Sequence, residues 1–376
     1  MTTKSREKEN KSSSNQPLVC VDLFAGAGGF SLAAMQAGFT IAAAVELNAH
    51  ACKTYKKNIA DSYGVSLYEG DILNVCPESM KKLDIGEHQE CDVLLGGPPC
   101  QGFSVHRIND AGVDDPRNKL IFKYFEFVKT IRPKVFLMEN VPGMLWARHR
   151  PFLDAFYLQA KAANYKVLQP IEIDARDYGV PQRRKRVFIL GIRNDVDLDI
   201  QWPPRPTHGD SKTLEQDETL LPWLIAQTVF QMDDMADDIN NIHMNHSQEL
   251  IDVFKATPKN GGSRHQSGRV LKCHQGHDGH KDVYGRIDLL KPGPTMTTAC
   301  INPSKGRFVH PTEDHGITVR QAARFQTFPD SFQFEGGLIA SGVQVGNAVP
   351  VKLGQVLLES IKKGLTVDPK KNTKRG

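Results

Sequence analysis

A cysteine follows two glycines and two prolines in the stretch GGPPCQGFS (96–104), directly after the apolar run CDVLL. Each proline fixes the backbone φ near −65° and removes an N–H donor, so strand pairing must stop at Pro98. Cys100 is therefore held in a rigid turn at the end of a strand, beside a polar loop (104–118). That setting suits a nucleophile, whose reactive form is the thiolate, better than a small buried apolar residue.

Two further groups of polar residues stand at strand ends. Glu139 and Asn140 close the apolar stretch VFLMEN (135–140), where a carboxyl group beside an apolar pocket could donate a proton. In the stretch PQRRKRVFIL, alternation along a strand places Arg184 and Arg186 on one face, and Gln182 extends that face. Two arginines that face the same way are suited to binding an anion or a carbonyl oxygen.

A glycine-rich turn, DLFAGAGGF (22–30), lies between an apolar run and a helical pattern. Its glycines allow the backbone to approach a ligand at the start of a helix. Glu46 follows Gly26 by twenty residues, which is where an acid binds the ribose hydroxyls in nucleotide-binding folds. The pair predicts a cofactor that contains a nucleoside, and Asp71 could bind an adenine amino group. No phosphate-loop lysine follows, so a triphosphate is disfavoured.

The segment CHQGHDGH (273–280), with His265 nearby, is the one candidate for a metal site in the sequence. Its spacing supplies no convincing second pair of zinc ligands. We therefore predict no metal.

Apolar runs alternate with helical patterns from residue 18 onward, which predicts βαβ units, a parallel sheet and an α/β fold. The first and fourth strands should flank the ligand crevice. Two helices are expected after the irregular middle of the chain. The predicted strands are 18–24, 40–47, 65–71, 91–97, 135–140, 166–174 and 186–193, and the predicted helices are 30–38, 118–131, 151–163, 318–328 and 351–363.

The chain divides by composition into four parts: a disordered polar tail (1–16), a catalytic and cofactor-binding domain (17–200), a smaller irregular or β domain (201–318), and a segment that forms the edge of this smaller domain and returns to the first (319–376). The net charge of +4 is too small to require a polyanionic partner, but basic residues cluster in 176–193 and at the C-terminus. Seven scattered cysteines, no signal peptide and no membrane-spanning run predict a cytoplasmic protein with reduced thiols.

Taken together, these segments resemble the DNA cytosine-5 methyltransferase family, specifically the bacterial restriction-modification enzymes. The matching blocks stand in the family's order and span residues 18 to 360: DLFAGAGG, Glu46, GD (70–71), GGPPCQGFS, ENVPGM, QRRKR, RQAARFQTFPDSF and QVGNAVP. The resemblance implies a Rossmann-like S-adenosylmethionine-dependent fold with a target-recognition domain over 201–318.

The same resemblance implies the chemistry. Cys100 would add to C6 of a cytosine flipped out of double-stranded DNA, so that C5 can take a methyl group from S-adenosylmethionine. Glu139 would contact N3 and the exocyclic amine, and Arg186, with Arg184 beside it, would hold O2. The enzyme would act as a monomer, and a cognate restriction endonuclease could accompany it.

By matching position, the cofactor would contact residues at several strand and helix ends. These are Phe24, Gly26, Gly29, Glu46, Asp71, Ile72, Pro99, Leu120, Asn347 and Ala348. Position 47, where some members carry an aromatic residue that stacks on adenine, is Leu47 here. The expected DNA contacts are Ser104, Gln182, Arg264 and Arg269. The last two lie in the stretch 258–275, where we expect the contacts with bases.

Three other functions are compatible with parts of the pattern. A tRNA cytosine-5 methyltransferase of the same fold would have a shorter recognition region. A catalytically silent DNA-binding regulator would not need Cys100, Glu139 and Arg186 together. A nicotinamide dehydrogenase would share the glycine-rich turn but would not explain the Pro-Pro-Cys segment.

Overall fold

The structure is a computed structural model that describes residues 17–81, 90–99, 119–232, 237–268 and 282–366. Cys100, Ser104, Arg269 and the segment 273–280 lie outside these ranges, as does the predicted tail.

One mixed sheet forms the centre of the first part of the chain, with strand order β3-β2-β1-β4-β5-β8-β6 and β7 paired to β8. Strands β1 to β5 are parallel, whereas β8 runs antiparallel to β5, β6 and β7. The strand order turns back between β1 and β4, as predicted. The strands are β1 (Leu18–Leu23), β2 (Phe39–Glu46), β3 (Ser66–Glu69), β4 (Val93–Gly96), β5 (Val135–Asn140), β6 (Tyr165–Val167), β7 (Ile171–Asp174) and β8 (Lys185–Arg193).

The predicted strand 166–174 is two strands in the structure, β6 and β7. Pro170 lies between them, and a proline cannot donate to the ladder of a sheet. Both strands still pair with β8, so the predicted closing pair of strands is present but interrupted.

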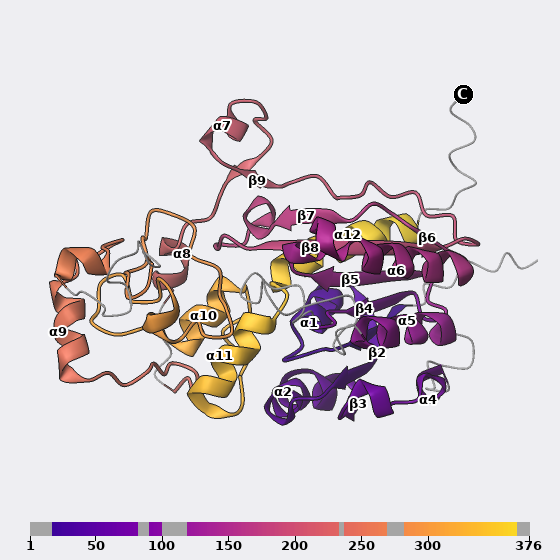
Figure 1. Cartoon of the computed structure of the whole chain (residues 1–376), viewed down its shortest axis with the longest axis horizontal. Helices are drawn as coiled ribbons and strands as arrows, with labels where there is room; N and C mark the ends of the chain where they lie inside the picture. The colour runs from indigo at the N-terminus through magenta and orange to yellow at the C-terminus, as the bar shows by residue number, and fades with distance from the viewer. Residues whose placement is uncertain (1–16, 82–89, 100–118, 233–236, 269–281, 367–376) are drawn as a thin grey trace, which may run out of the picture.

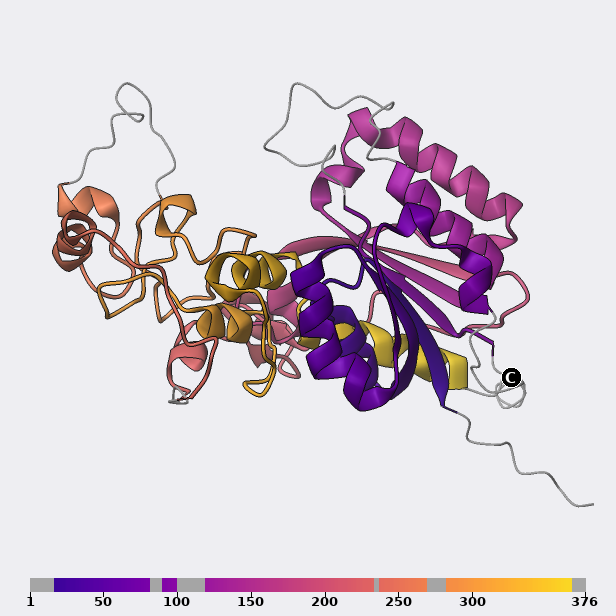
Figure 2. The ribbon, with the colours of Figure 1, turned by 90° about the horizontal axis from the view of Figure 1, so that it is seen from below.

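Helices cover both faces of the sheet, which makes a three-layer α/β fold and confirms the predicted fold class (Figure 2). On one face, Tyr124, Phe125 and Phe156 from α5 and α6 pack against β4 and β5. On the other face, α1 and α12 belong to a second core that includes Cys20 and Leu95. The helices of this part are α1 (Gly29–Gln36), α2 (Ala49–Tyr55), α3 (Asp61–Tyr63), α4 (Pro77–Lys81), α5 (Lys119–Ile131), α6 (Arg150–Ala162) and α12 (Val351–Thr366).

The described residues of 208–232, 237–268 and 282–347 lie beside the sheet in both views (Figures 1 and 2). The described part of this region contains little regular structure: β9 (His208–Gly209), β10 (Leu221–Pro222), α7 (Ser211–Leu214), α8 (Gln227–Phe230), α9 (Gln248–Ala256), α10 (Val319–Phe325) and α11 (Gly337–Asn347). Its core is continuous with the α1 and α12 side of the sheet, through residues such as Ile287 and Phe325. No helix in the described ranges is long and apolar enough to cross a membrane.

Candidate active site

The glycine-rich turn between β1 and α1 is held by the carboxylate of Glu46 at the end of β2. The Glu46 Oε2 atom accepts a hydrogen bond from Gly26 N at 2.8 Å, and Oε1 accepts one from Asn48 N at 2.7 Å. Phe24, Gly26 and Gly28 all have positive φ, which fixes the sharp path of the turn. A Cβ atom built on Gly26 would meet nothing within 4 Å, so this stretch of backbone is accessible to a ligand.

The other predicted cofactor residues lie at strand and helix ends. Asp71 caps the short turn after β3 by accepting from Leu73 N at 2.9 Å, and Ile72 beside it is buried. Leu47, next to Glu46, is 67% exposed although it is a large apolar residue. Pro99 is exposed and Leu120, in the first turn of α5, is half-buried.

The C-terminal segment approaches the glycine-rich turn from the other side. Asn347 is the exposed last residue of α11, and Ala348 continues in extended conformation. A Cβ atom built on Gly29 would lie 3.3 Å from Ala348 Cβ and 2.8 Å from Val349 O. The structure therefore brings Gly29 and Ala348, which are more than three hundred residues apart, into contact.

Glu139 and Arg186 form an ion pair at the end of β5, with 2.9 Å between Arg186 Nε and Glu139 Oε1. The two side chains are only 16% (Arg186) and 13% (Glu139) exposed. A Cβ atom built on Gly97 would lie 3.4 Å from Glu139 Oε2, and Asn140 Nδ2 donates to Pro98 O at 3.3 Å. The start of the turn that leads to the cysteine is thus packed against the strand that carries the carboxylate.

Arg184 and Gln182 face the interior, not the site. Arg184 is 1% exposed, and its guanidinium group donates to three backbone carbonyls, those of Met296, Gly346 and Ala348. Gln182 is wholly buried and hydrogen-bonded. The structure therefore does not support the direct contacts expected of Arg184 with a base and of Gln182 with DNA, because neither side chain reaches the surface.

The expectation that Arg264 contacts DNA is corrected for the same reason. This arginine begins a short 3₁₀ helix, and its side chain is 1% exposed. The expectation that it reads bases rested on its charge and its place in a glycine-rich, polar stretch. Neither property distinguishes a buried arginine from an exposed one.

An open groove of about 1210 Å³ lies between Arg183, at the entry to β8, and the segments 282–299 and 304–308. Four cations line it, and two of them are paired: Arg307 with Asp282, and Lys291 with Asp288. Among the described residues, Arg183 and Lys305 make no ion pair. The groove is therefore net basic, and its lining includes Gly261 from the stretch 258–275 in which we expected the base contacts.

A buried hydrogen-bonded chain beneath the glycine-rich turn was not predicted. Ser31 Oγ donates to Asp22 Oδ2 at 2.6 Å and lies 2.8 Å from Tyr55 Oη. Burial raises the pKa of Asp22 to about 7, the Ser31 hydrogen bond opposes that rise, and the nearby charge of Glu46 adds to it. The signal in the sequence was an aspartate inside an otherwise apolar strand, which only a partner can accommodate.

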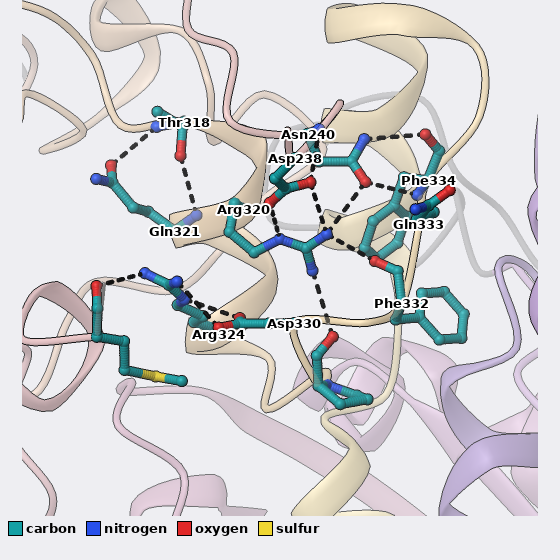
Figure 3. A network of polar contacts seen from close by, with 12 residues as sticks. Asp238, Asn240, Thr318, Arg320, Gln321, Arg324, Asp330, Phe332, Gln333 and Phe334 are labelled. Atoms are coloured by element: carbon teal, nitrogen blue, oxygen red, sulfur yellow. Dashed lines mark hydrogen bonds and ion pairs between the residues drawn. The ribbon is translucent and has the colours of Figure 1, made fainter. Parts of the chain in front are cut away.

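The block RQAARFQTFPDSF forms α10 and the turn after it, and its arginines are buried (Figure 3). Arg320 is ion-paired with Asp238 and donates to Phe332 O at 2.9 Å. Arg324 makes a two-point contact with Asp330, at 2.9 and 3.0 Å. These pairs join the segment before α9 to the turn after α10, so the arginines of this block stabilise the region between α8 and α11.

Comparison with known proteins decides the family. The model of the C-5 cytosine-specific DNA methylases matches residues 18–363, nearly the whole chain. The chain belongs to this family. As a C-5 cytosine-specific DNA methylase it is a DNA (cytosine-5-)-methyltransferase, and this confirms both the predicted family and the predicted activity.

Curated relatives are type II methyltransferases of restriction-modification systems. This methylase is 33% identical to M1.HphI of Haemophilus parahaemolyticus, over 92% of its own length and 87% of that protein. It is 32% identical to M.DdeI of Desulfomicrobium norvegicum, over 91% of its own length and 88% of that protein. A solved protein described as a DNA modification methyltransferase encoded within a prophage (E. coli) shares its fold, with a TM-score of 0.69 at 24% identity, covering 93% of this chain and all of that one.

Proposed function

We propose that this methylase transfers a methyl group from S-adenosylmethionine to C5 of a cytosine that is flipped out of a specific double-stranded DNA sequence, through a covalent bond between Cys100 and C6. It would thereby protect DNA from a cognate restriction endonuclease. The observation that carries the proposal is the Glu139–Arg186 ion pair, which lies against the turn leading to the nucleophile.

The residues around the glycine-rich turn fit a cofactor with an adenosine part. The Glu46 carboxylate is already oriented by two backbone N–H groups and keeps lone pairs for ribose hydroxyls. Exposed Leu47 offers an apolar surface to an adenine ring, and Asn347 and Ala348 would close the site from the C-terminal side. The cofactor would supply an electrophilic methyl group.

Each residue of the catalytic set has a distinct task. Attack of the Cys100 thiolate on C6 forms the S–C6 bond and makes C5 nucleophilic. The added electron pair is taken up by a proton that passes to N3 from the Glu139 carboxyl group, which would first take that proton from solvent. Arg186, which is ion-paired with Glu139, would hold that residue in place and bind O2 of the base. After C5 has accepted the methyl group, N3 would return its proton to Glu139 and a water molecule would take the C5 proton. The electrons of the C5–H bond then re-form the C5–C6 double bond and expel the Cys100 thiolate.

The groove beside Arg183 supports DNA as the partner. Its unpaired cations could neutralise phosphates, which supply most of the non-specific affinity of a protein for DNA. Flipping a base costs a few kcal/mol, and contacts of this kind offset that cost.

Incubation with methyl-labelled S-adenosylmethionine should label duplex DNA, and bisulfite sequencing of DNA from a host expressing the chain should locate one recurring site. Cys100→Ser should abolish labelling while leaving the cofactor Kd nearly unchanged, because the hydroxyl is a far weaker nucleophile. A duplex with 5-fluorocytosine at the mapped site should be trapped covalently by the wild type only. Equal labelling of transfer RNA, or a serine variant that keeps a tenth of the activity, would refute the proposal.

A further inference from the structure

Three buried polar side chains connect parts of the methylase that are far apart in the sequence. Gln182 and Arg184 lie just before the start of β8, two residues apart, and Gln326 comes directly after α10. All three are 1% exposed or less. We call them the interior clamp.

The clamp holds the peptide of Met296 from both sides. Gln182 Oε1 accepts from Met296 N at 2.9 Å, and Arg184 Nη1 donates to Met296 O at 2.8 Å. Between the two contacts, Arg183 N donates to Gly293 O at 2.8 Å. The entry to β8 is therefore fixed to the segment 293–297, which lines the basic groove.

The same side chains also hold the segment after α11. Arg184 Nη2 donates to Gly346 O and to Ala348 O, both at 3.0 Å. Gln326 Nε2 donates to Val345 O at 2.6 Å and to Ala348 O at 3.0 Å. These carbonyls flank Asn347, which we placed at the cofactor.

The two halves of the clamp are joined directly. Gln182 Nε2 donates to Gln326 Oε1 at 2.6 Å, so the groove side and the cofactor side share one hydrogen-bonded network. The segments themselves are also in close contact: a Cβ atom built on Gly346 would lie 2.2 Å from the Thr297 carbonyl carbon. Neither segment can move far without the other.

The choice of arginine is informative. Burying a guanidinium group is costly, and Arg184 offsets that cost with carbonyl groups, since it makes no ion pair among the described residues. Burial lowers the pKa of this group well below its ordinary value, and the charge of Arg186 adds to that effect. Arginine's rigid fork of donors can hold carbonyls of two segments at once, which lysine cannot reproduce.

We propose that the interior clamp couples the cofactor site to the basic groove and to β8, which carries Arg186, with Arg184 and Gln182 as positioning residues. Ordering of residues 345–348 by the cofactor is transmitted through Arg184 to Met296 and along β8 to Arg186, two residues further on the same face. The proposal rests on the proposed function, because it uses the cofactor contact at Asn347 and Ala348.

The test is the effect of DNA on cofactor affinity. The Kd of S-adenosylhomocysteine is measured by titration calorimetry with and without a duplex that carries the mapped site. The ratio of the two values is the coupling factor, and coupling between sites is typically about 5- to 150-fold. Wild type should show a ratio in this range, whereas Arg184→Lys should bring the ratio close to one.

Lys185→Met is the matched control. Lys185 precedes Arg186 in the same strand, where alternation points its side chain to the opposite face, and among the described residues its only ion pair is an exposed one with Glu172. The control should therefore keep the wild-type ratio. Should Arg184→Lys fail to fold, Gln326→Met removes the bonds to Val345 and Ala348 at similar volume, and the ratio should fall there too.

A residue with a purely structural role would lower the melting temperature and weaken both Kd values equally, leaving the ratio unchanged. A folded Arg184→Lys or Gln326→Met variant with the wild-type ratio would therefore overturn the clamp, as would a wild-type ratio of one. Failure of the proposed function is a separate result, because it would appear as absence of methyl transfer by the wild type.

Discussion

Replacing Asp22 by asparagine should remove a specific part of the pH dependence of stability. Asp22 is 1% exposed, and burial raises its pKa to about 7, whereas an aspartate in an unfolded chain has a pKa of about 3.9. Between these values the folded protein binds a proton that the unfolded chain has released. The stabilisation is complete below about pH 4 and is lost as the pH rises through about 7.

The size of the effect follows from the width of that window. Two pH units separate pH 5 from a pKa of about 7, and each unit is worth about 1.4 kcal/mol. On going from about pH 8 to about pH 5, Asp22 alone should therefore raise the free energy of unfolding by about 2.8 kcal/mol. Asparagine keeps an oxygen that can accept from Ser31 Oγ but does not titrate.

Urea unfolding of both proteins at the two pH values measures this contribution. Every other titrating group is shared, so the stability difference between wild type and Asp22→Asn isolates the one carboxyl group. The free energy of unfolding of the wild type, relative to that of Asp22→Asn, should be about 2 to 3 kcal/mol higher at the lower pH than at the higher pH. A difference that stays constant, or moves the other way, would show that Asp22 is ionised in the folded protein and that the reasoning from its burial is mistaken.

Two further substitutions test the cofactor site. Gly29→Ala should cost about 1 to 3 kcal/mol of stability and raise the KM for S-adenosylmethionine, because its Cβ atom would lie 2.8 Å from Val349 O and displace the C-terminal segment. Gly26→Ala is the control: it should leave that packing intact and cost only the strain of its positive φ, about 1 kcal/mol. Equal effects of the two variants on the melting temperature and on this KM would contradict the packing argument. Leu47→Phe should lower this KM about two- to tenfold at unchanged kcat, since an exposed aromatic ring can stack on adenine. An unchanged KM would place the adenine elsewhere.

The sheet could be predicted well because its signals are local. Buried parallel strands read as short apolar runs, and β1, β2, β4 and β5 begin and end within one or two residues of the predicted bounds. Helix α11 was missed because its sequence, GLIASGVQVGN, contains three glycines and two serine or asparagine residues that argue against a helix. It is held by packing against Ile301 and Thr297, which no local pattern reports.

In the candidate site, too, the features with a local sequence signal could be predicted and those set by distant contacts could not. Alternation at the entry to β8 predicted that Arg184 and Arg186 share one face, but it could not tell which of them would be covered. Arg184 is buried by carbonyls that lie more than a hundred residues away in the sequence, whereas Arg186 meets Glu139 across the adjoining strand. The roles of Cys100, Ser104 and Arg269 stay predictions.

The packing of α12 on α1 has a practical consequence for altering this methylase. A Cβ atom built on Gly354 would lie 2.7 Å from Ala33 Cβ, and Lys362 Nζ donates to Ala37 O at 3.0 Å, so the end of the chain completes the layer that covers its beginning. The irregular region is thus an insertion anchored at two points. Grafting another enzyme's specificity onto this scaffold would need two junctions, and a fragment that stops near residue 200 would expose the apolar side of its first helix to water.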